Sequence, residues 1–77
     1  MQEQIIAILN EICGADPGEI RGDTPLFDEG LLDSFALVQL IVALEDQLSV
    51  SLDPAELERS DMATPAAIAA TVAVHRA

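Results

Sequence analysis

The chain has 77 residues and carries 14 carboxylates against three basic residues, which gives a formal net charge of −11 at pH 7. A chain of this length forms one domain, residues 1–77, with a modest core, and its charge repels phosphate backbones, so we expect no nucleic-acid partner. Hydrophobic residues make up 51% of the sequence, yet Phe is the only aromatic type and occurs twice, so the core must be aliphatic, which favours helices.

The first predicted element is a helix over about residues 2–13. Apolar residues recur in it at helical spacing: Ile5, Ile6, Ile8, Leu9, Ile12 and Cys13. Gly14 follows at the position where a helix commonly ends. A single cysteine excludes an internal disulfide, and we expect Cys13 to be a small core residue.

A loop is predicted over about residues 14–33, because proline, glycine and turn-forming aspartate interrupt any helical period there. A loop of this length is uncommon in a small domain and is usually functional or disordered. Its apolar residues argue for order, since they can attach it to the helices: Ile20, Leu26, Phe27, Leu31 and Leu32. We expect an ordered crossover with room for one short turn of helix.

The most informative element is a helix predicted over about residues 34–48, whose start carries the capping signal Asp33-Ser34. One apolar stripe of this helix has the width of a core-facing surface and contains Leu37, Leu40, Ile41, Leu44 and Leu48. A second apolar face consists of Phe35, Val38 and Val42, bordered by Gln39, Glu45 and Asp46. A helix in so small a domain cannot easily bury both faces, so we interpret the second one as a docking surface. The alternative is a second core contact, made by the loop or by a neighbouring helix.

Residues 48–52 alternate apolar and polar, but the run is too short, and has no partner strand, to form a sheet. We therefore predict an extended connector that lays its apolar side on the core. Asp53-Pro54 then combines a cap with a proline at the first helical position. This signal predicts a short third helix over about residues 54–60, with Leu57 as its core contact.

Thr64-Pro65 repeats the cap-and-proline signal and predicts a last helix over about residues 65–75. Ile68 and Val72 are expected to face inward, at helical spacing. The predicted fold class is therefore all-α, a bundle of four helices with a long loop between the first two and a short third helix.

Few residues are available for catalysis or metal binding. His75 lies near the end of the chain, and nothing places it beside Ser34, so a serine nucleophile would lack the base that activates it. His75 and the single cysteine are too few for a zinc site. The acidic residues Asp28, Glu29 and Asp33 lack the alternating oxygens and the glycine of a calcium loop. We expect no catalytic residue, no metal and no enzymatic activity.

No segment is long and apolar enough to cross a membrane. The opening Met-Gln-Glu-Gln lacks the basic start of a signal peptide. We therefore expect a soluble, cytoplasmic monomer, whose negative field attracts basic patches on partner proteins.

The sequence around Ser34 resembles that of acyl and aminoacyl carrier proteins. The resemblance rests on residues 30–35 (Gly-Leu-Leu-Asp-Ser-Phe), on the long loop before them and on residues 40–45 (Leu-Ile-Val-Ala-Leu-Glu) after them. The family motif is an Asp-Ser pair that opens the second of four helices and is followed by a hydrophobic residue. The resemblance covers nearly the whole chain and implies the four-helix bundle of an acyl carrier protein.

The resemblance implies that Ser34 is the attachment point of 4′-phosphopantetheine, a covalent cofactor that a phosphopantetheinyl transferase takes from coenzyme A with magnesium. A helix start suits the phosphate, because free N–H groups and the positive end of the dipole meet there. Asp33 is assigned to capping and to contacts with basic residues of the transferase. The arm would hold an acyl or aminoacyl thioester at high effective concentration near its partners. These would be an adenylate-forming amino acid or acyl ligase, and a downstream acyl or aminoacyl transferase or biosynthetic enzyme.

Further segments of the sequence indicate which chemical group the arm would carry. Residues 26–34, Val38-Gln39-Leu40, Arg59 and Thr64-Pro65 are similar to the D-alanyl carrier proteins of teichoic acid modification. Stand-alone aminoacyl and peptidyl carriers of biosynthetic clusters are also similar. Ala36 and Gln39 stand where carriers of fatty-acid synthesis commonly have acidic residues, and Phe35 replaces the usual leucine. The resemblance thus implies an aminoacyl carrier, with a fatty-acid or polyketide acyl carrier as the alternative.

A rival from another functional class is an unmodified acidic helical adaptor. It would hold a basic partner through Phe35, Val38 and Val42. This hypothesis explains the negative net charge and the second apolar face of the helix, but it gives Ser34 no role beyond helix capping. Modification of the serine separates the two hypotheses.

Overall fold

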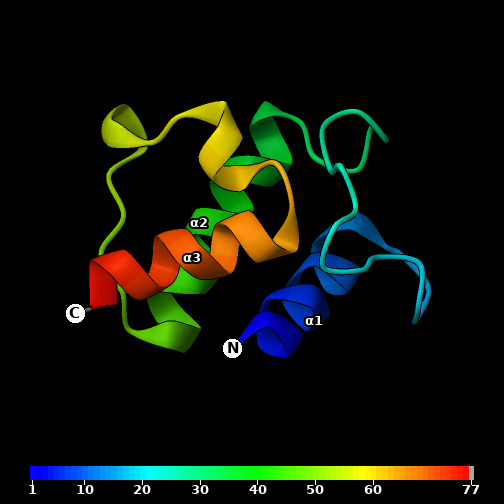
Figure 1. The fold of residues 1–77 in the computed structure, drawn as a ribbon, viewed down its shortest axis with the longest axis horizontal. Coiled ribbons are helices and arrows are strands. Elements are labelled where there is room, and N and C mark those ends of the chain that lie inside the picture. The colour runs from blue at the N-terminus through cyan, green and yellow to red at the C-terminus, as the bar shows by residue number, and fades with distance from the viewer. Residues whose placement is uncertain (77) are drawn as a thin grey trace.

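Three α-helices carry the fold: α1 (Gln2–Cys13), α2 (Ser34–Leu48) and α3 (Pro65–Arg76). Two short 3-10 turns, η1 (Pro54–Glu56) and η2 (Arg59–Met62), lie between α2 and α3. This computed structural model describes residues 1–76, in which no strand occurs, so the all-α class is confirmed. Helix α1 contacts both α2 and α3, and η2 contacts α3 (Figure 1).

The core is aliphatic, as the composition predicts. Its residues come from the three helices, from the long loop, from the connector that follows α2, and from η2. The buried members are Ile5, Ile8, Leu9, Ile20, Leu26, Leu32, Leu40, Ile41, Leu44, Leu48, Val50, Leu52, Met62, Ile68 and Val72. Within the described part of the chain, no polar or charged residue is buried. The negative charge of the protein therefore lies at its surface, where water screens it.

Helix α1 begins without a side-chain cap and ends at Gly14, whose φ of 66° lies in the left-handed region that glycine adopts most easily. The amides of Gly14 and Ala15 both donate to the carbonyl of Asn10, which satisfies the end of the helix. Cys13 is half-buried at the edge of the core and donates its thiol hydrogen to the carbonyl oxygen of Leu31, at 2.9 Å. The cysteine thus joins α1 to the long loop.

The loop between α1 and α2 is ordered by its apolar side chains, as predicted. Ile20, Leu26 and Leu32 are buried in the core, and Phe27 and Leu31 pack against it. Two backbone hydrogen bonds attach this loop to the segment that leads into α3: Leu26 N–H donates to Ala63 at 2.8 Å, and Ala66 N–H donates to Gly22 at 3.0 Å. The loop is therefore fixed both to the core and to the chain around the start of α3.

One helical turn lies inside the loop. The Glu29 amide donates to the Pro25 carbonyl at 2.9 Å, which is an α-helical hydrogen bond. At the end of the turn, the Gly30 amide donates to the Phe27 carbonyl at 3.1 Å and the Leu31 amide donates to the Leu26 carbonyl at 2.9 Å. This pattern, with Gly30 at a φ of 73°, is a Schellman motif, and it redirects the chain toward α2.

Helix α2 presents the two faces that its sequence predicts. Leu40, Ile41, Leu44 and Leu48 are buried and Leu37 is half-buried, so this stripe faces the core. Phe35, Val38 and Val42 are 74%, 60% and 59% exposed. The alternative, in which the second face is covered by the loop or by another helix, is therefore excluded.

The connector after α2 also follows its pattern. Val50 and Leu52 are buried while Ser49 and Ser51 are exposed, so the apolar side lies on the core. Ser49 ends α2 in the left-handed conformation, with a φ of 54°. The Leu52 amide then donates to the Glu45 carboxylate at 3.1 Å, which ties the connector back to α2.

The short third helix predicted over residues 54–60 is replaced by the two 3-10 turns, so the count of four helices is not confirmed. Each turn has its own acidic start: Asp53 accepts the Ala55 amide at 3.0 Å, and Glu58 forms a reciprocal capping box with Asp61. Glu58 itself is extended, with φ of −97° and ψ of 158°. Because the chain is capped twice within a few residues, no run of α-helical hydrogen bonds can develop.

Helix α3 begins where the sequence places it. The Thr64 hydroxyl accepts the Ala67 amide at 3.1 Å, and Ile68 and Val72 are buried. The Thr71 hydroxyl donates to the carbonyls of Asp61 and Ala67, so it fastens η2 to the helix. None of the helices described in residues 1–76 is both long and apolar enough to span a bilayer.

The two faces of α2 predict opposite responses to the same substitution. Leu44 is fully buried, so Leu44→Asp places an unpaired charge in an apolar core and should cost several kcal/mol, enough to unfold the domain. Val42 is mostly exposed, so Val42→Asp should change the free energy of unfolding by about 0.5 kcal/mol or less. Thermal unfolding followed by circular dichroism compares the two. Equal losses of Tm would contradict the assignment of the faces.

Candidate functional site

The candidate site is built around the first residue of α2. Asp33 is the N-cap: its backbone is extended, with φ of −126° and ψ of −175°, and its carboxylate accepts the Ala36 amide at 2.8 Å. Its carbonyl accepts the Leu37 amide, also at 2.8 Å, as the first hydrogen bond of the helix. Ser34 follows as the first helical residue and is exposed. The cap is Asp33, which leaves the serine hydroxyl outside the capping interaction.

The surroundings of Ser34 favour an anion. The amides of Ser34 and Phe35 precede the first helical hydrogen bond, so the helix supplies no carbonyl for them. The positive end of the helix dipole lies at the same place. No acidic residue occupies the first turn of α2 itself, and the Asp33 carboxylate is turned to the Ala36 amide. A phosphate on the serine would therefore meet free donors and a favourable dipole.

A groove of about 240 Å³ opens beside Ser34. We call it the Ser34 groove, and its lining residues are Phe27, Ser34, Leu37, Ile41, Leu57, Glu58, Arg59 and Met62. Helix α2 supplies one wall, the segment around η2 supplies the other, and the long loop contributes Phe27. Most of the lining is apolar, and Glu58 and Arg59 provide its charges. The Arg59 guanidinium lies over the Phe27 ring, 4.4 Å from its centroid.

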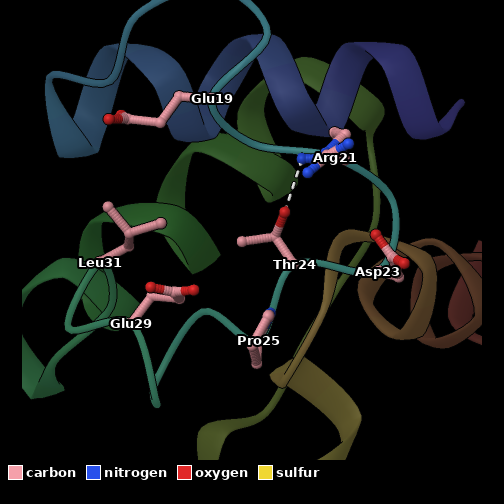
Figure 2. Close-up of a pocket in the computed structure, with 7 residues that line it drawn as sticks. All are labelled: Glu19, Arg21, Asp23, Thr24, Pro25, Glu29 and Leu31. Atoms are coloured by element: carbon pink, nitrogen blue, oxygen red, sulfur yellow. Dashed lines mark hydrogen bonds between the residues drawn. The ribbon is translucent and has the colours of Figure 1, made fainter.

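A second, larger hollow of about 460 Å³ lies within the long loop (Figure 2). Its lining residues are Glu19, Arg21, Asp23, Thr24, Pro25, Glu29 and Leu31. The Arg21 amide donates to the Thr24 hydroxyl across it at 2.7 Å, which stabilises a turn. Ser34 does not line this hollow. Within residues 1–76, no group of three or more His, Cys, Asp or Glu is placed to hold a metal ion. The hollow thus belongs to the turns of the loop and shares no lining residue with the Ser34 groove.

The predicted docking face begins directly after Ser34. Its apolar members Phe35, Val38 and Val42 are exposed on successive turns of α2, and Gln39 and Asp46 beside them are exposed as well. Glu45 differs from this expectation. It is half-buried, and its carboxylate holds the Leu52 amide. The predicted rim residue Glu45 therefore has a structural contact that the sequence did not indicate.

The structure does not bring a base to the serine. His75 is exposed near the end of α3, and its Nδ1 lies 2.9 Å from the carbonyl oxygen of Thr71 on the same helix. No histidine lines the Ser34 groove. Cys13 is not a nucleophile for this site either, since burial raises the pKa of its thiol and the Asp33 carboxylate raises it further. Among the described residues, neither the histidine nor the cysteine therefore lines the Ser34 groove.

Sequence reasoning missed the second wall of the groove. Glu58, Arg59 and Met62 lie far from Ser34 along the chain, and the pattern of residues 54–60 predicted only a short helix. The sequence did single out Arg59 among the positions that resemble carrier proteins, but it did not place this residue beside Ser34. A further signal is compositional. Arg59 is one of only three basic residues in a chain with 14 carboxylates.

Comparison with known proteins gives consistent matches over most of the chain. A family model described as a phosphopantetheine attachment site matches residues 3–72. A D-alanyl carrier protein of Lactococcus lactis subsp. cremoris (strain MG1363) is 44% identical over 72 residues, which cover 94% of this chain and 91% of that protein. D-alanyl carrier proteins of Bacillus mycoides (strain KBAB4) and Bacillus cereus (strain B4264) are each 39% identical over 64 residues, 83% of this chain and 81% of theirs.

Proposed function

The chain belongs to the family of phosphopantetheine carrier proteins, and from this membership we propose that Ser34 is the residue that bears the 4′-phosphopantetheine arm. The observation that carries the proposal is the position of Ser34, exposed at the first residue of α2 with Asp33 as the cap. The hydroxyl is accessible to a transferase, and the adjoining amides and dipole suit a phosphodiester. The Ser34 groove beside it adds a guanidinium and an apolar surface.

Each residue of the site has a limited part in this chemistry. Asp33 fixes the start of α2 and hence the orientation of Ser34. Ser34 Oγ forms the bond to phosphorus, and the nucleotide half of coenzyme A leaves. No histidine lines the groove, and we assign removal of the serine proton to the phosphopantetheinyl transferase, which also brings the magnesium. The bound arm supplies a terminal thiol on which the cargo is held as a thioester. The protein itself is a substrate of its partner enzymes and has no catalytic residue.

The cargo proposed is an aminoacyl group, D-alanyl or a close analogue. The support is the name carried by the similar proteins, D-alanyl carrier protein, at 39% to 44% identity over most of the chain. An adenylate-forming ligase would load the amino acid, and a downstream aminoacyl transferase would remove it. Both the ligase and the phosphopantetheinyl transferase draw on ATP or coenzyme A, so we place the carrier in the cytoplasm. Fatty-acid and polyketide cargo remains the alternative that the loading assay below tests.

The exposed face of α2 is proposed as the surface on which these enzymes dock. Phe35, Val38 and Val42 present apolar area next to the arm, and Gln39 and Asp46 border it. Apolar groups that become fully desolvated hold a complex together, whereas charges at the rim mainly set the encounter rate and its salt dependence. With a net charge of −11, the carrier favours partners whose docking sites are apolar with a basic rim.

The attachment site is tested by incubating the apo-protein with coenzyme A, magnesium and a broad-specificity phosphopantetheinyl transferase. Intact mass should show one arm on the wild-type protein and none on Ser34→Ala. Ser51→Ala is the matched control, because Ser51 is also exposed but lies outside any helix, and it should be modified like the wild type. A modified Ser34→Ala protein would overturn the assignment of the site.

The docking face and the cargo are tested together by loading holo-protein with radiolabelled amino acid, ATP and the ligase encoded alongside. Phe35→Ala removes a 74% exposed apolar anchor and should lower loading by roughly tenfold or more. Asp46→Ala removes a rim charge and should change it by about threefold or less. Both variants should still accept the arm. Transfer of malonyl or long-chain acyl groups, with no loading of any amino acid, would contradict the aminoacyl assignment.

A further inference from the structure

Arg59 is an unusual residue in this chain. It is one of three basic residues among 14 carboxylates, and it lies on η2 in the wall of the Ser34 groove. Its guanidinium rests on the Phe27 ring, 4.4 Å from the centroid. Arg59 is exposed, and an exposed contact between a cation and an aromatic ring is weak. The guanidinium can therefore exchange this ring for a stronger partner at little cost.

The other charged residue of the groove, Glu58, contributes to the capping of η2. The carboxylate of Glu58 accepts the backbone amide of Asp61, and the Asp61 carboxylate accepts the amide of Glu58 in return. Both carboxylates are thus committed to capping η2. Among the described lining residues, Arg59 is the cation, and it shares the groove with Ser34.

We propose that Arg59 is the positioning residue of the phosphopantetheine arm, and that its guanidinium binds the phosphodiester carried by Ser34. This inference rests on the proposed function, since it requires the arm on Ser34. A guanidinium presents several N–H donors in a plane that matches phosphate oxygens, which an ammonium does not. The contact joins η2 to the start of α2 across the groove, so it directs the arm along the apolar lining.

Electrostatics gives the contact a further role. Modification adds a negative charge to a domain that already carries −11. Repulsion between like charges destabilises a compact state, most strongly at low salt. Arg59 offsets this added charge locally, at the place where it is introduced. Arg21 provides a natural comparison, because it is also exposed but lines the hollow of the long loop, which Ser34 does not reach.

The test compares apo- and holo-forms of the wild type, Arg59→Gln, Arg59→Lys and the matched control Arg21→Gln. In the wild type, attachment of the arm should shift the Arg59 Nε–H resonance and leave that of Arg21 in place. The ³¹P resonance of the holo-protein should shift in Arg59→Gln, remain unchanged in Arg21→Gln and move only partly in Arg59→Lys. At low salt, the change in Tm on modification should be more negative in Arg59→Gln than in Arg21→Gln, by roughly 2 °C or more.

Phe27→Leu separates the proposed role from a purely structural one. This variant removes the ring but keeps the guanidinium and an apolar lining, so adding Arg59→Gln to it should still shift the ³¹P resonance, as it does in the wild-type background. If Arg59→Gln lowers Tm equally in apo- and holo-forms and leaves the ³¹P resonance unchanged, Arg59 acts only through Phe27 and the inference is wrong. Failure of the wild type to take up the arm would instead overturn the proposed function, because intact mass reports attachment independently of Arg59.

Discussion

The hydrogen bond from the Ala36 amide to the Asp33 carboxylate is the interaction on which the arrangement of the site depends. It fixes the residue at which α2 begins. With the helix started there, Ser34 is the first helical residue, the core stripe falls on Leu40 and Leu44, and the apolar residues from Phe35 onward face outward. A start one residue later would make Ser34 the N-cap and would draw its hydroxyl into the capping interaction. The cap thus links the fold to the chemistry of one hydroxyl.

The long loop has to deliver Asp33 to that position. Its turn ends at Gly30 in a Schellman motif, Leu32 is buried immediately before the cap, and the Leu26 amide is bonded to Ala63. The same turn carries Phe27, which packs under Arg59. The loop therefore positions the start of α2 and also contributes Phe27 to the lining of the Ser34 groove. Its length, which is unusual for a small domain, serves the site as much as the connection between the helices.

Local sequence signals predicted most of the fold. Helical periodicity indicated both faces of α2, and Gly14 and Thr64-Pro65 marked where neighbouring helices end and begin. The 3-10 turns were not predicted because Asp53 and Glu58 compete as caps within one short segment, and propensity does not decide between one helix and two turns.

The site was only partly predictable, for a different physical reason. Asp33 and Ser34 form a capping signal that is visible in the local sequence, so the sequence located the start of α2. The Ser34 groove depends on contacts between segments far apart in the chain, such as Arg59 on Phe27. The hydrogen bond from the Leu52 amide to the Glu45 carboxylate also joins two elements, the connector and α2. It gives Glu45, which was predicted to be a surface residue, a structural contact. No periodicity within one segment encodes contacts of this kind.

The central claim is that Ser34 carries a phosphopantetheine arm with a thioester-bound aminoacyl cargo. The most direct test is the intact mass of the protein purified from its own host, measured before and after thioester cleavage with hydroxylamine, with the modified peptide then mapped. We expect one arm on Ser34, and an additional mass of an amino acid that hydroxylamine removes. A protein that carries no arm, or an arm on another residue, would contradict it.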